Sequence, residues 1–136
     1  MTENPLDALP HGYPFRFIDR VLSIGGGKGA AIKNVTANEA FLQGHFKGNP
    51  IMPGAVIIEA LAQLAGLVMN EGGEAQGAYL AQVRDMRFRR PVTPGDRVEL
   101  FAELDGGFPQ MSIFRVSASV DGVAVAEGEV VMAAMK

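Results

Sequence analysis

Two side chains, His45 and Glu59, are the best placed in this sequence for acid–base chemistry. His45 stands in a loop rich in glycine and proline, directly before an apolar segment. Loops held by a rigid scaffold often carry catalytic residues. Glu59 lies inside the apolar segment, where a lone carboxylate is unfavourable unless it is paired, hydrogen-bonded or protonated. A histidine can act as a base and a protonated glutamate as a general acid.

The segment that carries Glu59, Gly54–Met69, is predicted to be a long helix. Its residues are apolar on nearly all sides, which is typical of a helix buried in a core. Pro53 is a favourable residue at a helix start, and Asn70 followed by Gly72-Gly73 supplies a stop.

Two features of this helix could support the chemistry. Gln63 follows Glu59 by four residues and faces the same way, so its amide could hold the carboxyl. The free N–H groups at the helix start near Gly54 suit an oxygen that gains negative charge. A base, an acid and such a helix end are compatible with proton abstraction next to a carbonyl or with hydrolysis, and the spacing alone does not choose between them.

The remaining chain alternates apolar and polar residues, as strands do. Two strands before the helix and four after it predict an α+β fold, in which a curved antiparallel sheet wraps around one buried helix. Gly25-Gly26-Gly27 and Asp121-Gly122 are predicted hairpin turns. The predicted strands are Arg16–Ile24, Lys28–Thr36, Tyr79–Arg90, Arg97–Leu104, Ser112–Val120 and Val123–Ala133.

Composition excludes several classes of protein. The 136 residues fit one domain, 1–136, and the net charge of −3 does not favour nucleic-acid binding through bulk positive charge. The absence of cysteine excludes disulfides, thiolate metal sites and a cysteine nucleophile. The first residues do not form a secretory signal, and Glu59 argues against a membrane span, so we expect a cytoplasmic protein.

Eight short motifs occur in order and together resemble the (3R)-hydroxyacyl-acyl-carrier-protein dehydratases of bacterial type II fatty acid synthesis. The resemblance spans nearly the whole chain, and the loop from Gly44 to Gly54, followed by Glu59, is highly specific in combination. The motifs are Leu9–Phe15, Asp19–Val21, Lys33–Thr36, Gln43–Phe46, Gly48–Gly54, Glu59–Gln63, Arg87–Val92 and Pro94–Asp96.

The resemblance implies a hotdog dimer, often a trimer of dimers, with active sites at the dimer interface. His45 of one subunit would take the α-proton, and Glu59 of the other would protonate the leaving hydroxyl. The Gly54 N–H would hold the thioester oxygen. The acyl chain, delivered on acyl carrier protein, would lie in an apolar tunnel near Phe46 with Tyr79 at its mouth.

The family resemblance also implies that no metal or redox cofactor is needed. A catalytic glutamate, rather than an aspartate, resembles the branch that only dehydrates and does not isomerise the double bond. Departures from the family pattern at Lys47, Gln82 and Arg84 fall near the tunnel and its gate. We expect them to affect acyl chain length or carrier preference, as in a paralogue from a specialised pathway.

A basic stretch and the second histidine complete the candidate residues. The arginines could form a docking surface for an acidic carrier protein, or a solvated strand face. His11, between Pro10 and Pro14, is predicted to be structural. The docking arginines are Arg84, Arg87, Arg89 and Arg90, with Arg97 beyond them.

Three alternatives remain beside the dehydratase. A hotdog acyl thioesterase shares the fold and a buried carboxylate. A non-catalytic acyl-binding subunit of a synthase would not need both an acid and a base. A third possibility is a chain that acts only as a heterodimer with a sister chain.

Overall fold

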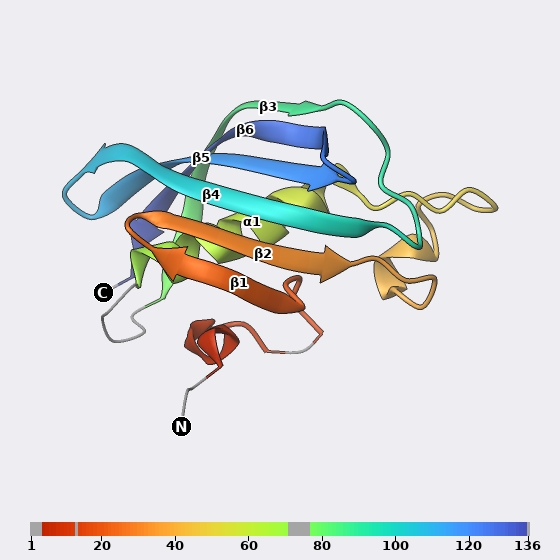
Figure 1. Ribbon diagram of the computed structural model, residues 1–136, viewed down its shortest axis with the longest axis horizontal. Coiled ribbons are helices and arrows are strands. Elements are labelled where there is room, and N and C mark those ends of the chain that lie inside the picture. The colour runs from red at the N-terminus through yellow and green to blue at the C-terminus, as the bar shows by residue number, and fades with distance from the viewer. Residues whose placement is uncertain (1–3, 13, 71–76, 136) are drawn as a thin grey trace.

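The computed structural model describes residues 4–12, 14–70 and 77–135. Within these ranges, two strands precede one α-helix and four strands follow it, as predicted (Figure 1). The strands are β1 (Arg20–Gly25), β2 (Lys28–Asn34), β3 (Ala78–Phe88), β4 (Arg97–Phe108), β5 (Met111–Val120) and β6 (Val123–Ala134). The helix is α1 (Gly54–Met69), and two short 3-10 helices are η1 (Pro5–Ala8) and η2 (Ala40–Leu42).

The six strands form one antiparallel sheet in the order β1-β2-β4-β5-β6-β3. The sheet curves around α1, which lies against one of its faces (Figure 1). Alternate residues of the central strands point toward the helix and are buried, among them Leu100, Phe114, Val116 and Val130. Because burying apolar area is the main driving force for folding, this shared core holds the helix on the sheet. The predicted α+β hotdog architecture is therefore confirmed.

The bounds of α1 agree with the prediction from Gly54 to Met69. Asn70 ends the helix as expected, and its N–H donates to Gly66 O at 3.2 Å. The predicted contribution of Gly72-Gly73 lies outside the described residues. No helix in the described ranges is both long and apolar enough to cross a membrane.

The predicted start of the first strand, Arg16, is wrong, because β1 begins at Arg20. The backbone at Phe15 and Phe17 is bound to the side chain of Gln63 instead of to a neighbouring strand. Backbone N–H and C=O groups each need a partner, and here a buried side chain provides it. Both predicted hairpin turns are present, and Gly26, Gly27 and Asp121-Gly122 all have positive φ, as tight two-residue turns require.

The edge strand β3 contains two irregularities in its pairing with β6, between Leu80 and Gln82 and between Arg84 and Arg87. At the second, Asp85 has a φ of 51°. Gly128 of β6 faces this bulge, and a Cβ there would lie 2.7 Å from Met86 Cα. The bulge therefore depends on glycine at position 128.

Candidate active site

His45 lies in the loop between η2 and α1, and its ring is fixed by its own loop. Nδ1 is 2.9 Å from the backbone oxygen of Ile51. Since a carbonyl oxygen only accepts, Nδ1 carries the proton, and Nε2 keeps a lone pair that can accept one. The ring stacks on Phe46 with centroids 4.1 Å apart, and the peptide bond between the two residues is cis. His45 is thus in the tautomer that a general base requires.

The start of α1 lies beside His45. Val56 and Ile57 donate the first hydrogen bonds of the helix, both to Pro53 O. The N–H of Gly54 precedes them and has no place in the helical ladder. A cavity of about 290 Å³ is lined by both His45 and Gly54. A base and a backbone donor near the positive end of the helix dipole therefore face the same space.

Phe88, from the end of β3, covers the start of α1. A Cβ on Gly54 would lie 2.8 Å from Phe88 Cζ and 3.0 Å from Cε1. The ring is 48% exposed, so solvent reaches its other side. Glycine at position 54 allows the aromatic ring to lie directly on the helix start and to form one wall of the His45 cavity.

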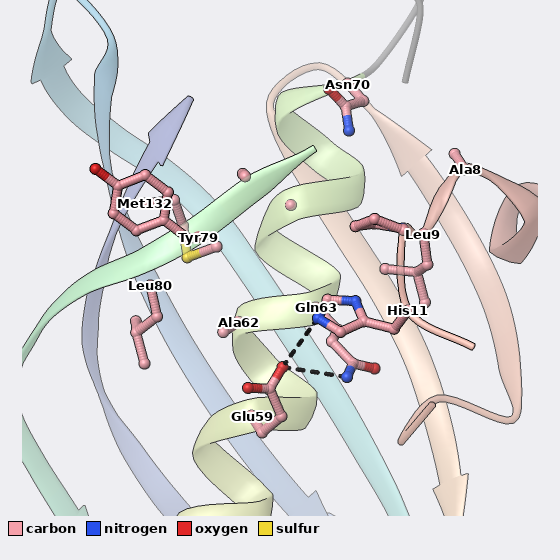
Figure 2. Close-up of a pocket in the computed structure, with 13 residues that line it drawn as sticks. Ala8, Leu9, His11, Glu59, Ala62, Gln63, Asn70, Tyr79, Leu80 and Met132 are labelled. Carbon is pink, nitrogen blue, oxygen red and sulfur yellow. Dashed lines mark hydrogen bonds and ion pairs between the residues drawn. The ribbon is translucent and has the colours of Figure 1, made fainter. Parts of the chain in front are cut away.

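Glu59 projects from the next turns of α1, and two side chains contact one of its oxygens (Figure 2). Gln63 Nε2 donates to Oε2 at 3.1 Å, as its spacing of four residues predicted. His11 Nε2 is 3.7 Å from the same oxygen. The Glu59 side chain is 26% exposed, so the carboxyl is half-buried rather than enclosed.

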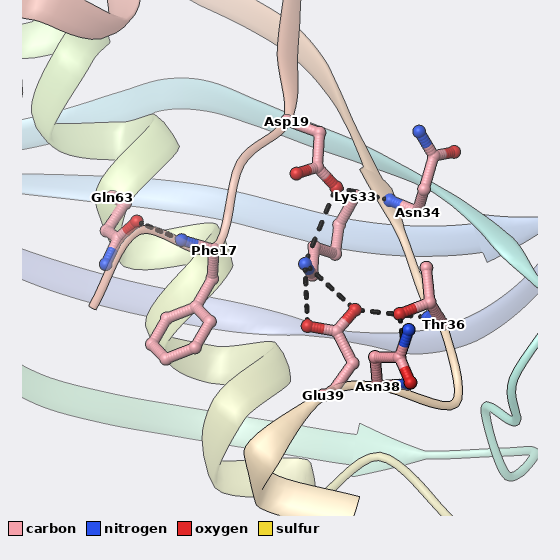
Figure 3. A network of polar contacts seen from close by, with 8 residues as sticks. All are labelled: Phe17, Asp19, Lys33, Asn34, Thr36, Asn38, Glu39 and Gln63. Carbon is pink, nitrogen blue, oxygen red and sulfur yellow. Dashed lines mark hydrogen bonds and ion pairs between the residues drawn. The ribbon is translucent and has the colours of Figure 1, made fainter. Parts of the chain in front are cut away.

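Gln63 joins this carboxyl to the segment that precedes β1. Its Nε2 also donates to Phe15 O at 2.9 Å. Its Oε1 accepts from Phe17 N at 3.0 Å (Figure 3). The side chain is only 2% exposed. Both polar atoms of this buried amide have hydrogen-bond partners, as a buried polar group requires. These bonds fix the segment before β1 next to Glu59.

A cavity of about 140 Å³ lies between α1, residues 8–11 and the start of β3. Its polar lining includes Glu59, Gln63 and His11, and Tyr79 lies on β3 with 54% of its surface exposed (Figure 2). The remaining lining is largely apolar and is formed by Ala8, Leu9, Pro10, Ala62, Gly66, Asn70, Ala78, Leu80 and Met132.

A buried lysine holds the loop that leads to His45. Lys33 of β2 is 5% exposed, and its Nζ lies 3.2 Å from Glu39 Oε2 and 3.5 Å from Asp19 Oδ2 (Figure 3). The two carboxylates are also held by backbone, since Asn34 N–H donates to Asp19 and Thr36 N–H donates to Glu39. A buried charge needs such pairing, and this cluster joins the segment before β1, β2 and the start of η2.

Comparison with known proteins gives the family. The model of the FabA-like domain matches residues 9–129. The chain belongs to the FabA-like family. Curated relatives include a protein of Acetivibrio thermocellus, 48% identical over 90% of this chain and 86% of the relative. Another, from Herpetosiphon aurantiacus, is 43% identical over 97% of this chain and 96% of the relative. Both are named 3-hydroxyacyl-[acyl-carrier-protein] dehydratase FabZ, so the predicted resemblance is confirmed.

Solved structures support the FabA-like fold. A chain of the dehydratase heterocomplex ApeI:P from Xenorhabdus doucetiae gives a TM-score of 0.84 at 19% identity, covering 99% of this chain and 93% of that one. The HP0420 homologue from Helicobacter felis gives 0.74 at 15% identity, covering 100% of this chain and 93% of that one.

Within one FabA-like chain, the two predicted catalytic residues line different cavities. His45, with Gly54, borders the space at the helix start, whereas Glu59, Gln63 and Tyr79 border the other. From Gly54 to Glu59 an α-helix advances about 7.5 Å and turns through roughly 140° beyond one full circle. Within one chain the base and the backbone donor thus form one group, and the carboxyl with Gln63 and Tyr79 forms another.

His11 is the residue near the site that sequence reasoning did not place there. It was predicted to be structural, and the structure puts it beside Glu59. The contact joins residues that are 48 apart in the chain, so no local spacing could reveal it. The sequence feature that could have indicated a role for His11 in the site was its position in the motif Leu9–Phe15.

Three of the four candidate docking arginines of this FabA-like chain border cavities. Arg87 and Arg89 border a groove with Glu127 and Glu129 on the sheet face opposite α1. Arg89 pairs with Glu127, and no other of the four arginines has an ion pair with a described residue. Arg89 and Arg90 also border the His45 cavity, whereas Arg84 is the β3 partner of Glu129.

Proposed function

We propose that this protein dehydrates a (3R)-3-hydroxyacyl thioester on acyl carrier protein to the trans-2-enoyl thioester, in fatty acid biosynthesis. The strongest support is 43–48% identity to curated 3-hydroxyacyl-[acyl-carrier-protein] dehydratases over 90–97% of the chain. The site offers a base, an acid and a backbone donor, as this reaction needs. The enzyme is therefore a hydro-lyase.

The roles of the residues follow from their surroundings. His45 Nε2 takes a proton from C2 of the substrate, since Nδ1 is occupied by Ile51 O. The electron pair forms the C2=C3 bond, the C3–O bond breaks, and the leaving hydroxyl takes the proton of the Glu59 carboxyl to depart as water. The N–H of Gly54 stabilises the thioester oxygen while it gains negative charge. Returning one proton from His45 to Glu59 restores the enzyme.

The acyl chain is assigned to the space next to Glu59. Leu80, Met132 and Ala62 give this cavity an apolar lining, while Tyr79 lies at its exposed border. An alkyl chain is stabilised where it leaves water for apolar surface. The Phe46 ring, stacked on His45 and 53% exposed, lines the approach of the reacting carbons.

The complete site is formed by two copies of the chain. β3 is an edge strand, and its exposed side chains include the large apolar residues Tyr79, Val83 and Phe88. An edge with free backbone groups and exposed apolar side chains favours pairing with another strand. Pairing two β3 strands in a homodimer would bring the His45 cavity of one copy toward the Glu59 cavity of the other.

Mixing two inactive variants tests the shared site. We expect His45→Ala and Glu59→Gln to be inactive alone, and the isolated mixed dimers to regain about half of wild-type activity, because each of them holds one intact site of two. Subunits are mixed by co-expression with two tags, and double-tagged dimers are assayed against each single variant. Activity that stays at the level of the single variants would place both residues in one subunit.

Acyl carrier protein is proposed to dock at the end of β3. Arg90 borders the His45 cavity, and no described carboxylate pairs with it. A free positive charge at the rim of a site attracts an acidic partner. The trimer of dimers and the cytoplasmic location expected from the sequence remain predictions.

The first experiment follows enoyl absorbance and free thiol together, with a 3-hydroxyacyl thioester on carrier protein. We expect enoyl formation without thiol release. Thiol release without enoyl product would identify a thioesterase instead. Neither signal across several chain lengths would favour a binding subunit, or a chain that needs a sister subunit.

A further inference from the structure

The surroundings of His11 give it a role that packing does not explain. Its Nε2 points at Glu59 Oε2 from 3.7 Å, while its Nδ1 is buried and has no hydrogen-bond partner among the described residues (Figure 2). A histidine that serves only as structure normally satisfies its buried nitrogens. Here the one nitrogen with a polar neighbour is the one that faces the carboxyl.

The surroundings of the two ring nitrogens also indicate which tautomer His11 adopts. A proton on Nε2 is favourable because a carboxylate oxygen faces it. A second proton on Nδ1 would create a buried donor without an acceptor, which is unfavourable. The arrangement therefore favours the tautomer that directs an N–H from Nε2 toward Glu59. This is the opposite tautomer to that of His45, whose Nδ1 donates to Ile51 O.

Both neighbours of Glu59 hold the same oxygen. Gln63 donates to Oε2 at 3.1 Å and His11 approaches Oε2. No described residue makes a hydrogen bond or an ion pair with Oε1, which points away from both side chains (Figure 2). The separation of 3.7 Å is longer than a hydrogen bond, and such contacts often shorten when substrate is bound.

We propose that His11 is a positioning residue, which together with Gln63 holds Oε2 of Glu59 so that Oε1 faces the leaving hydroxyl. This inference rests on the proposed function, because the oriented oxygen is the one that delivers the proton. His11 is held in turn by a stack on Phe15, with ring centroids 5.8 Å apart. The position of the segment before β1 thus affects the catalytic acid through this histidine.

Two substitutions separate the donor role from packing. His11→Phe keeps an aromatic ring against Phe15 and removes the N–H, whereas His11→Gln removes the ring and keeps an N–H donor of similar reach. We expect His11→Phe to lower kcat about 10- to 100-fold with KM nearly unchanged, since displacement of a catalytic group by roughly 1 Å can cost about 100-fold. His11→Gln should recover most of that loss. The reverse order, or equal activity of the two variants, would overturn the proposal.

A spectroscopic measurement tests the contact without relying on turnover. The chain has only two histidines, so the imidazole ¹⁵N spectrum contains few signals, and those missing in His11→Gln belong to His11. We expect Glu59→Gln to shift the His11 signals, and unchanged signals would refute the contact. If the contact is seen but the wild-type protein forms no enoyl product, the proposed function fails while the His11–Glu59 pair stands.

Discussion

His45 and Glu59 lie on one stretch of chain but are held by different kinds of contact. His45 is fixed within its own loop, by a backbone oxygen six residues away and by the adjacent Phe46 ring. Glu59 is held through Gln63 and His11 by the segment before β1, whose residues are 46 to 48 positions away. The first region is built from local geometry, whereas the second forms only when distant parts of the chain meet.

Because of this difference, we expect the two regions to respond differently to amino-acid substitutions. Local contacts survive changes elsewhere as long as the loop itself folds. A region that depends on a docked segment can lose its geometry through any change that loosens the segment, because the contacts that hold it join distant parts of the chain. We therefore expect the Glu59 region to be sensitive to changes in the segment before β1, and the His45 region to be sensitive mainly to changes in its immediate neighbours.

Removing the reactive group of either region should give the largest effect. His45→Ala and Glu59→Gln are each expected to lower kcat about 100- to 10,000-fold or more, the usual contribution of a general acid or base. Enoyl formation measures the loss, and thermal unfolding should show that both variants fold. Turnover near the wild-type rate in either variant would remove that residue from the catalytic pair.

Gln63→Leu should damage the Glu59 region through its distant contacts. Leucine fills a similar volume but leaves Phe15 O and Phe17 N–H without a partner, at about 1–3 kcal/mol each. We expect the free energy of unfolding to fall by about 2–5 kcal/mol, measured in urea, and kcat to fall with it. The matched variant Gln43→Leu changes an exposed residue in the loop of His45 and should shift stability by less than about 0.5 kcal/mol.

A methyl group at Gly54 should disturb the His45 region locally. In Gly54→Ala the new Cβ meets the Phe88 ring, and overpacking of this kind costs about 1–3 kcal/mol. The expected result is a lower kcat with His11, Gln63 and Glu59 undisturbed. Phe88→Leu in the same chain should restore part of the loss, and a double-mutant cycle measures the coupling. Additive effects of the two changes would mean that the ring does not rest on the helix start as described.

Charge reversal at the rim should give the smallest effect. Arg90→Glu is expected to raise KM for acyl-carrier substrate roughly five-fold, which corresponds to about 1 kcal/mol of binding free energy. The increase should be smaller at high salt. Arg20→Glu, on the opposite edge strand, makes the same change of charge as a control. Arg89 is a poorer choice, because a glutamate there would face Glu127 and disturb the strand pair itself. An unchanged KM in Arg90→Glu would place the dock elsewhere.

The sequence predicted best what depends on nearby residues. The bounds of α1, the Gln63–Glu59 hydrogen bond and both hairpin turns follow from spacing, apolar pattern and turn chemistry. The start of β1 was wrong, because no propensity reveals that a glutamine side chain takes the backbone groups of Phe15 and Phe17.

His11 was missed for the same physical reason. Its partner is set by how the segment before β1 docks on α1, which is a tertiary contact rather than a local pattern. The arginines of β3 alternate as a strand predicts, but their charge is partly balanced by Glu127 and Glu129 of β6. The pairing of β3 with β6, which are far apart in the sequence, determines which arginines lie next to a glutamate and which can still attract an acidic partner.

The two borders of the sheet are unequal, and this has a consequence for assembly. β3 has 11 residues, whereas β1 has 6. A sheet with two long borders could add copies at both and grow into an endless ribbon. With β1 so short, the pairing we propose at β3 would end after a single partner. The same asymmetry that would leave room for a shared site would thus keep the assembly closed.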